Sequence, residues 1–416
     1  MKKNAFYAQS GGVTSVINAT ASALILEARK HKNIGKIFAG KNGIIGALNE
    51  DLIDTSKESI SAIESLQSRA GGAFGSCRFK LKDFESNKKE YKRLIEVFKA
   101  HNIGYFFYNG GNDSADTAFK VSQISKKLNY PINCIAIPKT VDNDLVLTDC
   151  CPGFGSAAKY IATSTMEASL DVKSMAATST KVFILEVMGR HAGWMAASSS
   201  LARKNKGDAP HIILLPEVIF NQKKFLDQVK KTVSRNGYCV VVVSEGLKNN
   251  KNKFLAEADT KDAFGHAQLG GVAPYIANLI TDKLKMKNHW AVSDYLQRSA
   301  RHISSKTDLD QAMEVGIKAI QYAVKGMNGV MPIIVRGKGK KYTWKIEPAP
   351  LSKIANLEKK LPKSYISKNG MDVTPKAVEY LQPLIQGESF PKFKNGIPEI
   401  KDLKLVEVKK KLGPWT

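Results

Sequence analysis

Cysteine is scarce in this chain of 416 residues: there are five, and two of them, Cys150 and Cys151, are adjacent. An odd and sparse set cannot form a disulfide framework, and no Cys-x-x-Cys pair has the spacing of a zinc site. These features favour a reducing compartment, and we expect a cytoplasmic protein.

Long apolar runs are also missing. No segment approaches the roughly 18 apolar residues of a membrane-spanning helix. The N-terminus lacks the apolar core and the small-residue cleavage site of a secretory signal. The longest apolar runs, such as Cys239–Val243, have the length of one strand. We therefore expect a soluble protein with no membrane partner.

Acidic residues are few: 38 Asp and Glu stand against 63 Lys and Arg, a net charge of +25. Such a charge suits nucleic acid, a phosphorylated substrate or simply a basic surface. The lysines are dispersed, with tight clusters only at 336–341 and 409–411. Tyr342 and Trp344 follow the first cluster, which leaves a base-stacking face open as an alternative. We expect a solvated basic surface and no nucleic-acid partner.

Strand and helix patterns alternate through the first two thirds of the chain. A long helix pattern covers Thr14–Lys30, and another opens near Ser114. Six apolar runs are typical of buried strands: Ala5–Ala8, Tyr105–Tyr108, Cys134–Ile137, Val182–Val187, Ile212–Leu215 and Val240–Val243. Continuous apolar strands spaced by helices predict an α/β fold of doubly wound, mostly parallel sheets. From about residue 337 the chain is less periodic, with helix patterns near Lys353–Lys360 and Pro375–Gln382.

Glycines and polar residues directly follow several predicted strands. In doubly wound sheets the carboxyl ends of the strands form the ligand crevice. Gly11 and Gly12 join a strand to a helix, where a backbone without side chains and free N–H groups suit an anion. Gly111, Asn112 and Asp113 repeat this arrangement, although the polar pair also suits a plain helix start.

The densest cluster is the loop at 138–144. Lys139 and Thr140 can bind a phosphate, and Asp142 can take a proton from a substrate hydroxyl. Asp144 can serve Mg²⁺ or orient the loop. The alternative is an acidic helix cap beside a surface lysine.

Arginines and one further carboxylate follow other strands or loops. Arg190 is suited to clamp a phosphate because its guanidinium is a planar fork of donors. Arg78 ends a glycine-rich loop, Glu245 ends a strand, and Arg298 stands alone, so each is also compatible with an ordinary surface role. Together these residues suit phosphoryl transfer, in which positioning and charge stabilisation dominate. No P-loop and no protein-kinase motif is present.

Taken together, the motifs resemble the phosphofructokinase family over about residues 4–335, and most closely its pyrophosphate-dependent branch. The resemblance rests on six motifs in order: SGG at 10–12, GGND at 110–113, PKTVDND at 138–144, EVMGRHAGW at 186–194, SEG at 244–246 and YLQR at 295–298. It implies a donor-binding α/β domain of 1–153 with 298–350, a sugar-phosphate domain of 154–297 and a C-terminal extension of 351–416.

The resemblance also implies roles for single residues. Asp142 resembles the base that deprotonates the 1-hydroxyl of fructose 6-phosphate, and Lys139 and Arg190 would stabilise the transferred charge. The donor would contact Gly11, Gly12, Arg78, Gly111, Asn112, Asp113 and Thr140, with Mg²⁺ as cofactor at Asn112, directly or through water. The sugar phosphate would contact Thr140, Asp142, Asp144, Met188, Gly189, Arg190, Glu245, Tyr295 and Arg298.

Two positions predict the phosphoryl donor. ATP-using relatives have glycine where this chain has Asp113 and Lys139. Asp113 places bulk and negative charge in the path of the ATP α-phosphate, and Lys139 places a cation where pyrophosphate needs one. We therefore expect reversible transfer from pyrophosphate to fructose 6-phosphate, a step of glycolysis and gluconeogenesis. An ATP-dependent 6-phosphofructokinase is the alternative.

Three departures from the family pattern leave further alternatives open. Asn112 replaces a frequent aspartate. Lys181 replaces an arginine of the family that reaches the neighbouring subunit's 6-phosphate site, and the family's second such arginine would fall near His289 in this chain, with Lys287 close by. These changes are compatible with sedoheptulose 7-phosphate as the substrate, or with a regulatory subunit. Because the family completes its sugar site with a neighbouring subunit, we expect a homodimer or homotetramer.

Overall fold

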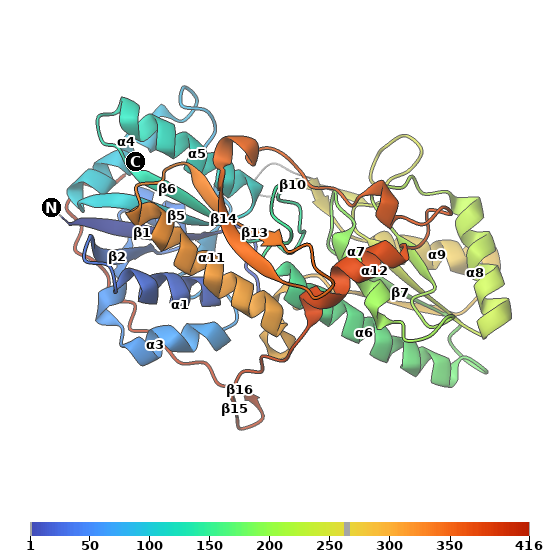
Figure 1. The fold of residues 1–416 in the computed structure, drawn as a ribbon. Coiled ribbons are helices and arrows are strands. Elements are labelled where there is room, and N and C mark those ends of the chain that lie inside the picture. Colours follow the sequence, from blue (N-terminus) through green and yellow to red (C-terminus); the bar gives the residue numbers. More distant parts are fainter. Residues whose placement is uncertain (1, 262–266, 416) are drawn as a thin grey trace.

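The structure is a computed structural model that describes residues 2–261 and 267–415. Its elements form two halves that lie side by side (Figure 1), each built on a sheet covered by helices. None of the helices in these ranges is long and apolar enough to cross a bilayer.

The larger sheet has the order β14-β13-β6-β5-β1-β2-β3, with β4 also paired to β1. The neighbours from β13 to β2 are parallel, and β14 and β3 are antiparallel edge strands. The strands are β1 (Lys3–Ser10), β2 (Ile34–Gly40), β3 (Leu52–Asp54), β4 (Ser76–Cys77), β5 (Ile103–Gly110), β6 (Asn133–Pro138), β13 (Val330–Arg336) and β14 (Trp344–Pro350).

Helices cover both faces of this sheet, as its sequence pattern predicts. Ala5 and Tyr7 of β1 pack into a core with α1, α3 and α11, whereas Phe6 and Ala8 pack against α2, α4 and α5. Successive residues of a strand point to opposite faces, so a strand buried on both sides is apolar throughout. The helices are α1 (Ile17–Ala28), α2 (Ile44–Leu48), α3 (Ile60–Ser65), α4 (Lys88–Ala100), α5 (Asn112–Lys127) and α11 (Lys306–Val324).

The second half contains a parallel sheet of order β12-β7-β9-β8. Its strands are β7 (Val182–Val187), β8 (Ile212–Leu214), β9 (Cys239–Ser244) and β12 (Asn288–Val292). The surrounding helices are α6 (Phe154–Met175), α7 (Trp194–Ser198), α8 (Gln222–Asn236), α9 (Val272–Leu284) and α10 (Leu296–Ser299), and β10 (Glu257–Lys261) pairs with β11 (Ala267–Leu269). The predicted α/β class with mostly parallel sheets is confirmed, whereas the residue boundaries of the domains stay a prediction.

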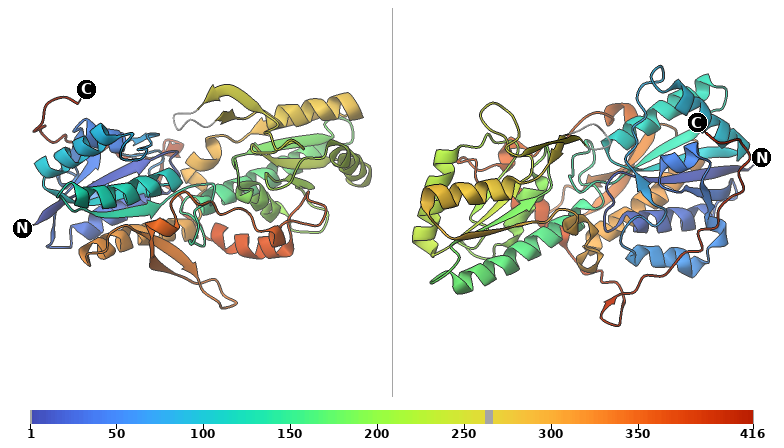
Figure 2. Two further views of the ribbon diagram at one scale, coloured as in Figure 1. Left: turned by 90° about the horizontal axis from the view of Figure 1, so that it is seen from above. Right: turned by 180° about the vertical axis from the view of Figure 1, so that it is seen from behind.

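The C-terminal extension contacts both halves. Its helix α12 (Pro375–Leu381) lies on the second half, and the chain then returns across the first half through the hairpin of β15 (Phe393–Lys394) and β16 (Ile397–Pro398), as Figure 2 shows. The last segment runs beside β3, where Val408 N donates to Leu52 O over 2.8 Å.

Two helix predictions need correction. The helix expected at Thr14–Lys30 is shorter, because α1 spans Ile17–Ala28 and begins after a turn. The helix expected near Lys353–Lys360 is wrong: a 3₁₀ turn at Leu351–Lys353 is followed by a hydrogen-bonded turn at 354–356 and then by a segment without helix. Asn356 there has φ of +62°, which interrupts a right-handed helix, and the polar groups that follow bind other elements.

Candidate active site

A cleft of about 1000 Å³ is lined by loops that follow strands of both sheets. It contains every predicted site residue except Gly189 and Lys181: Gly11, Gly12, Arg78, Gly111, Asn112, Asp113, Lys139, Thr140, Asp142, Asp144, Met188, Arg190, Glu245, Tyr295 and Arg298. The carboxyl ends of parallel strands lie at one edge of a sheet, which is why motifs distant in sequence meet here.

The loop after β6 carries the central group of the site. Thr140 Oγ1 accepts from Asp142 N over 3.1 Å and lies 3.5 Å from Asp142 Oδ2, so the hydroxyl fixes the carboxylate against the backbone. Lys139 N donates to Gly110 O over 3.1 Å, which joins this loop to the end of β5. Asp142 therefore faces the cleft from a loop that hydrogen bonds hold in place.

Burial changes the charges of this loop. Burial raises the pKa of Asp142, although Lys139 and Arg190 act in the opposite direction. Burial and then the charge of Asp142 raise the pKa of Asp144 to about 7. Burial and then the charge of Arg298 lower the pKa of Lys139 to about 8. A carboxyl group with a pKa of about 7 and an ammonium group with a pKa of about 8 suit proton transfer and anion binding at physiological pH.

Two glycines of the first motif lie beside cations. A Cβ on Gly11 would lie 3.5 Å from Lys139 Nζ, and a Cβ on Gly12 would collide with the Arg298 guanidinium. The Arg298 guanidinium also stacks on Tyr295, with Cζ 3.9 Å from the ring centre. The absence of side chains at 11 and 12 therefore lets positive groups from other loops come close to the backbone, where an anion would be held.

The loop after β7 is shaped by backbone conformation. Gly189 has φ of +135°, a region that side chains disfavour, and its N donates to Glu245 Oε1 over 3.3 Å. Met188 N donates to Gln297 Oε1 over 3.2 Å. Burial and then the charge of Asp142 raise the pKa of Glu245 to about 7. Gly189 thus acts on the cleft through the backbone that carries Met188 and Arg190.

The helix α5 begins at Asn112, at the opposite side of the cleft. Asp113 forms an ion pair with Lys80 at 2.6 Å. Asn112 is hydrogen-bonded at both ends of its amide: Oδ1 accepts from Asn356 N over 2.6 Å, and Nδ2 donates to Leu357 O over 2.5 Å. Its predicted contact with Mg²⁺ stays a prediction, in competition with these bonds.

Sequence reasoning missed several lining residues. Lys80 lies two residues after Arg78, and no sequence motif marks it as a site residue. Asn356, Leu357, Glu358 and Lys360 come from the C-terminal extension, more than 240 residues from Asn112, and no motif indicates their place. His191 also lines the cleft, and its Nδ1 lies within hydrogen-bond distance of Glu358 Oε1, at 2.8 Å.

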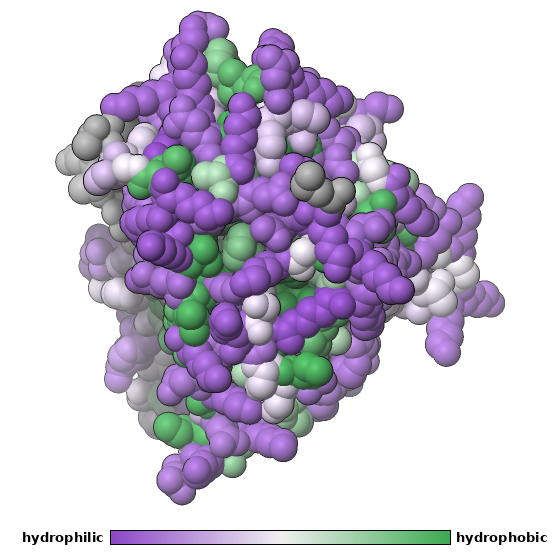
Figure 3. All heavy atoms as spheres, turned by 90° about the vertical axis from the view of Figure 1, so that its left-hand side faces the viewer, coloured by the Kyte–Doolittle hydropathy of each residue, from purple (hydrophilic) through white to green (hydrophobic). Residues whose placement is uncertain are grey.

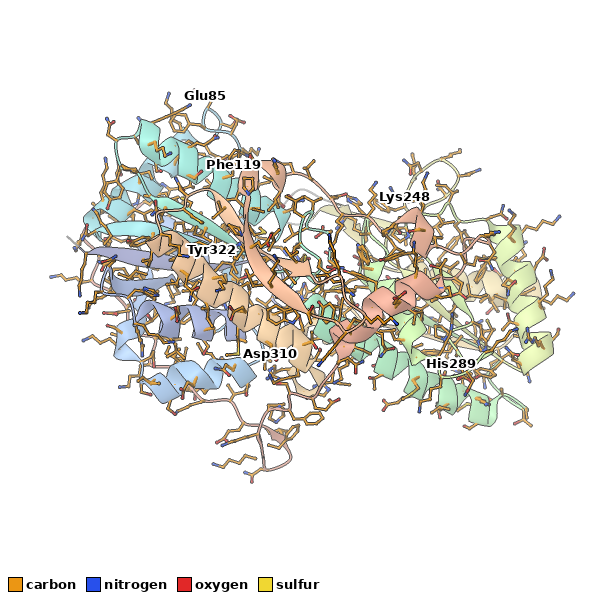
Figure 4. All side chains as sticks on the ribbon, in the orientation of Figure 1. Glu85, Phe119, Lys248, His289, Asp310 and Tyr322 are labelled. Carbon is orange, nitrogen blue, oxygen red and sulfur yellow. The ribbon has the colours of Figure 1, made fainter. Side chains whose placement is uncertain are left out.

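Lys181 lies outside the cleft. Its Nζ donates to the carbonyl oxygens of Ala176 and Ala177 at the end of α6, where a cation is favourable. His289, labelled in Figure 4, is an exposed residue of β12. The role of Lys181 toward a neighbouring subunit stays a prediction.

Comparison with known proteins agrees with this geometry. The family model described as "Phosphofructokinase" matches residues 4–323. A pyrophosphate–fructose 6-phosphate 1-phosphotransferase of Halomonas elongata is 57% identical over 410 residues, covering 98% of both chains. The crystal structure of a pyrophosphate-dependent phosphofructokinase from Marinobacter aquaeolei is 58% identical, covers 99% of both chains and has a TM-score of 0.91. Phosphofructokinase of Pichia pastoris, at 18% identity and a TM-score of 0.67, shares the fold over 85% of this chain. The chain therefore belongs to the phosphofructokinase family.

Proposed function

We propose that this chain transfers a phosphoryl group from pyrophosphate to the 1-hydroxyl of fructose 6-phosphate, giving fructose 1,6-bisphosphate and phosphate in a reversible reaction. The observation that carries the proposal is the presence of Asp142 and Lys139 in one loop of the cleft, beside the amino end of α5, whose first turn carries Asp113. That arrangement supplies a base, a cation for a short phosphate donor and a negative charge where a longer donor would run.

The chemistry follows from the positions of the side chains. Asp142 accepts the proton of the 1-hydroxyl, and the oxygen attacks the distal phosphorus of pyrophosphate in line. The bond to the bridging oxygen breaks, and phosphate leaves. Lys139, Arg190 and the backbone at Gly11 and Gly12 hold the charge of the transferred group.

We propose that Mg²⁺ binds in this cleft. Among the described residues no group of three or more His, Cys, Asp or Glu side chains is arranged to hold a metal. Mg²⁺ usually takes one or two protein oxygens and binds substrate phosphates with the rest of its shell. Asp142 and Asp144 offer carboxylates whose pKa values are raised by burial, and Asn112 offers an amide oxygen. When bound, Mg²⁺ would neutralise pyrophosphate and polarise it.

A paired rate assay tests the proposal. The purified protein is given fructose 6-phosphate and Mg²⁺, with pyrophosphate in one arm and ATP in the other. We expect turnover with pyrophosphate. Turnover only with ATP would contradict the assignment of pyrophosphate as donor. No turnover with either donor would contradict the proposed activity on fructose 6-phosphate. A third arm with sedoheptulose 7-phosphate compares the two sugar phosphates.

The assembly and location are part of the same proposal. We infer a homodimer or homotetramer in the cytoplasm, because the family shares sugar sites between subunits and because the five cysteines are all free thiols within buried surroundings.

A further inference from the structure

The segment 356–360 of the C-terminal extension borders the cleft at the first turn of α5. Asn356 and Leu357 are exposed to the cleft, and their backbone groups hold the amide of Asn112 at 2.6 and 2.5 Å. Asn356 Nδ2 also donates to Asp116 Oδ1 over 3.0 Å, one helical turn further along α5. The segment therefore covers the start of this helix.

The other end of the segment is fixed as well. Lys359 N donates to Asp144 O over 2.6 Å, and Lys359 Nζ donates to the carbonyl oxygens of Thr148 and Asp149 at 3.0 and 2.9 Å. Glu358 pairs with His191 on the opposite loop at 2.8 Å. Because it is bonded to both sides of the cleft, this segment can act as a wall.

From this geometry we propose that Asn356 and Leu357 exclude a nucleoside from the phosphoryl donor by closing the space beyond the end of its phosphate chain. The inference rests on the proposed function. A donor whose phosphates lie between Lys139 and the amino end of α5 would extend past Asn112 and Asp113 toward Asn356 and Leu357. A nucleoside there would have to displace Asn356 and Leu357 and break their bonds to α5.

This wall is separate from the barrier formed by Asp113 and Lys139. Those two side chains act on the phosphate chain through charge and bulk, whereas Asn356 and Leu357 act on whatever is attached to it. Linear tripolyphosphate and ATP distinguish the two barriers, because both carry a third phosphate and only ATP carries a nucleoside.

The test starts from the variant Asp113→Gly/Lys139→Gly, in which the phosphate barrier is removed. We expect this variant to use or bind tripolyphosphate better than ATP. Adding Asn356→Gly and Leu357→Ala should raise kcat/KM for ATP at least about tenfold and change the value for tripolyphosphate less than about threefold. Glycine suits position 356, where φ is +62°.

Matched controls carry Asn395→Gly, at a φ of +52° in the β15–β16 turn, and Leu170→Ala, an exposed leucine of α6, in the same background. They should leave both donors unchanged. If turnover is lost in the background, calorimetric affinities for ATP and tripolyphosphate give the same comparison. An equal gain for both donors, or no gain for ATP, overturns the proposal. Failure of the unaltered protein to use pyrophosphate would instead contradict the proposed function.

Discussion

Single side chains in the cleft owe their chemistry to burial. Asp142 and Asp144 are carboxylates that burial makes harder to ionise, and Lys139 is an ammonium that burial makes easier to deprotonate. The charges of Asp142 and Asp144 favour the charged form of Lys139, and Lys139 favours ionised Asp142, whereas the charge of Asp142 opposes ionisation of Asp144. The charge state of the loop at 138–144 therefore depends on all three side chains.

Asp142→Ser tests the base. We expect turnover with pyrophosphate to fall by about 10²- to 10⁴-fold, because general-base catalysis contributes that much, while fructose 6-phosphate binding is retained. Steady-state kinetics and calorimetric binding of the sugar phosphate separate the two effects. Asp402→Ser, at an exposed carboxylate of the extension, is the control. Equal losses of binding and turnover would contradict the assignment.

We expect the ionisation of Lys139 to control how kcat/KM for pyrophosphate falls at alkaline pH. Its pKa of about 8 means that the ammonium loses its charge as the pH rises through 8, so kcat/KM for pyrophosphate should fall above that value. On the acid side, protonation of Asp142 removes the base, and kcat/KM should fall as the pH drops below the raised pKa of the carboxyl.

The variant Lys139→Arg checks this assignment. A guanidinium stays charged throughout the range, so the alkaline fall should move up by more than about one pH unit, at a lower overall rate. Measuring wild type and variant with the same substrates cancels the ionisations of pyrophosphate and sugar phosphate. An unchanged alkaline limb would mean that another group controls it.

At the scale of elements, the extension is fastened to the first half by a buried carboxylate. Glu50 accepts from Lys411 N over 2.5 Å and from Leu412 N over 3.0 Å, and it lies 2.6 Å from His101 Nε2. Only 1% of Glu50 is exposed, so its oxygens depend on these partners. The last residues of the chain thus share a core with the segment after α2.

Glu50→Gln tests this attachment. An amide nitrogen cannot accept from a backbone N–H, so one buried bond is lost, and we expect the free energy of unfolding to fall by about 1–3 kcal/mol. Urea denaturation followed by circular dichroism measures the change. Glu64→Gln, at an exposed position of α3, should change it by less than about 0.5 kcal/mol. A Glu50→Gln effect as small as that of the control would show that the extension is held elsewhere.

What the sequence predicts differs between elements. The strand at Val182–Val187 has the predicted bounds, because a strand buried on both faces leaves an unbroken apolar run. The loop at 138–144 follows a strand and carries its own polar motif, so its place in the cleft can be predicted. Asn356 and Leu357 cannot be found in this way, because their position depends on bonds to Asn112 and not on local periodicity.

At the scale of the whole molecule, the surface is hydrophilic on one face and carries exposed apolar side chains near the cleft. The face in Figure 3 is mostly hydrophilic, in keeping with the dispersed lysines. On the second half, large apolar side chains near the cleft are exposed: Trp290 by 48%, Tyr295 by 60% and Leu296 by 62%. In the described part of the chain, β12, which carries Trp290, is an edge strand of its sheet. Exposed aromatic groups at a sheet edge favour a protein interface, in agreement with the expected oligomer.

Mixing two inactive variants tests whether sites are shared between subunits. Asp142→Ser removes the base, and Lys181→Glu reverses the charge predicted to serve a neighbour, so each protein alone should be nearly inactive. In a mixed dimer, one site combines Asp142 of one subunit with Lys181 of the other. Random reassembly of equal amounts should therefore restore about a quarter of wild-type turnover.

The control is Lys231→Glu, an exposed lysine of α8, mixed with Asp142→Ser in the same way. Because Lys231→Glu should be active alone, turnover after mixing should equal the average of the two proteins and show no gain. Light scattering after chromatography verifies that each variant assembles to the same mass. If the first mixture stays inactive although subunits exchange, Lys181 and Asp142 act in the same subunit, and the sugar site is complete within one chain. If Lys181→Glu alone keeps full turnover, the 6-phosphate is held without this lysine.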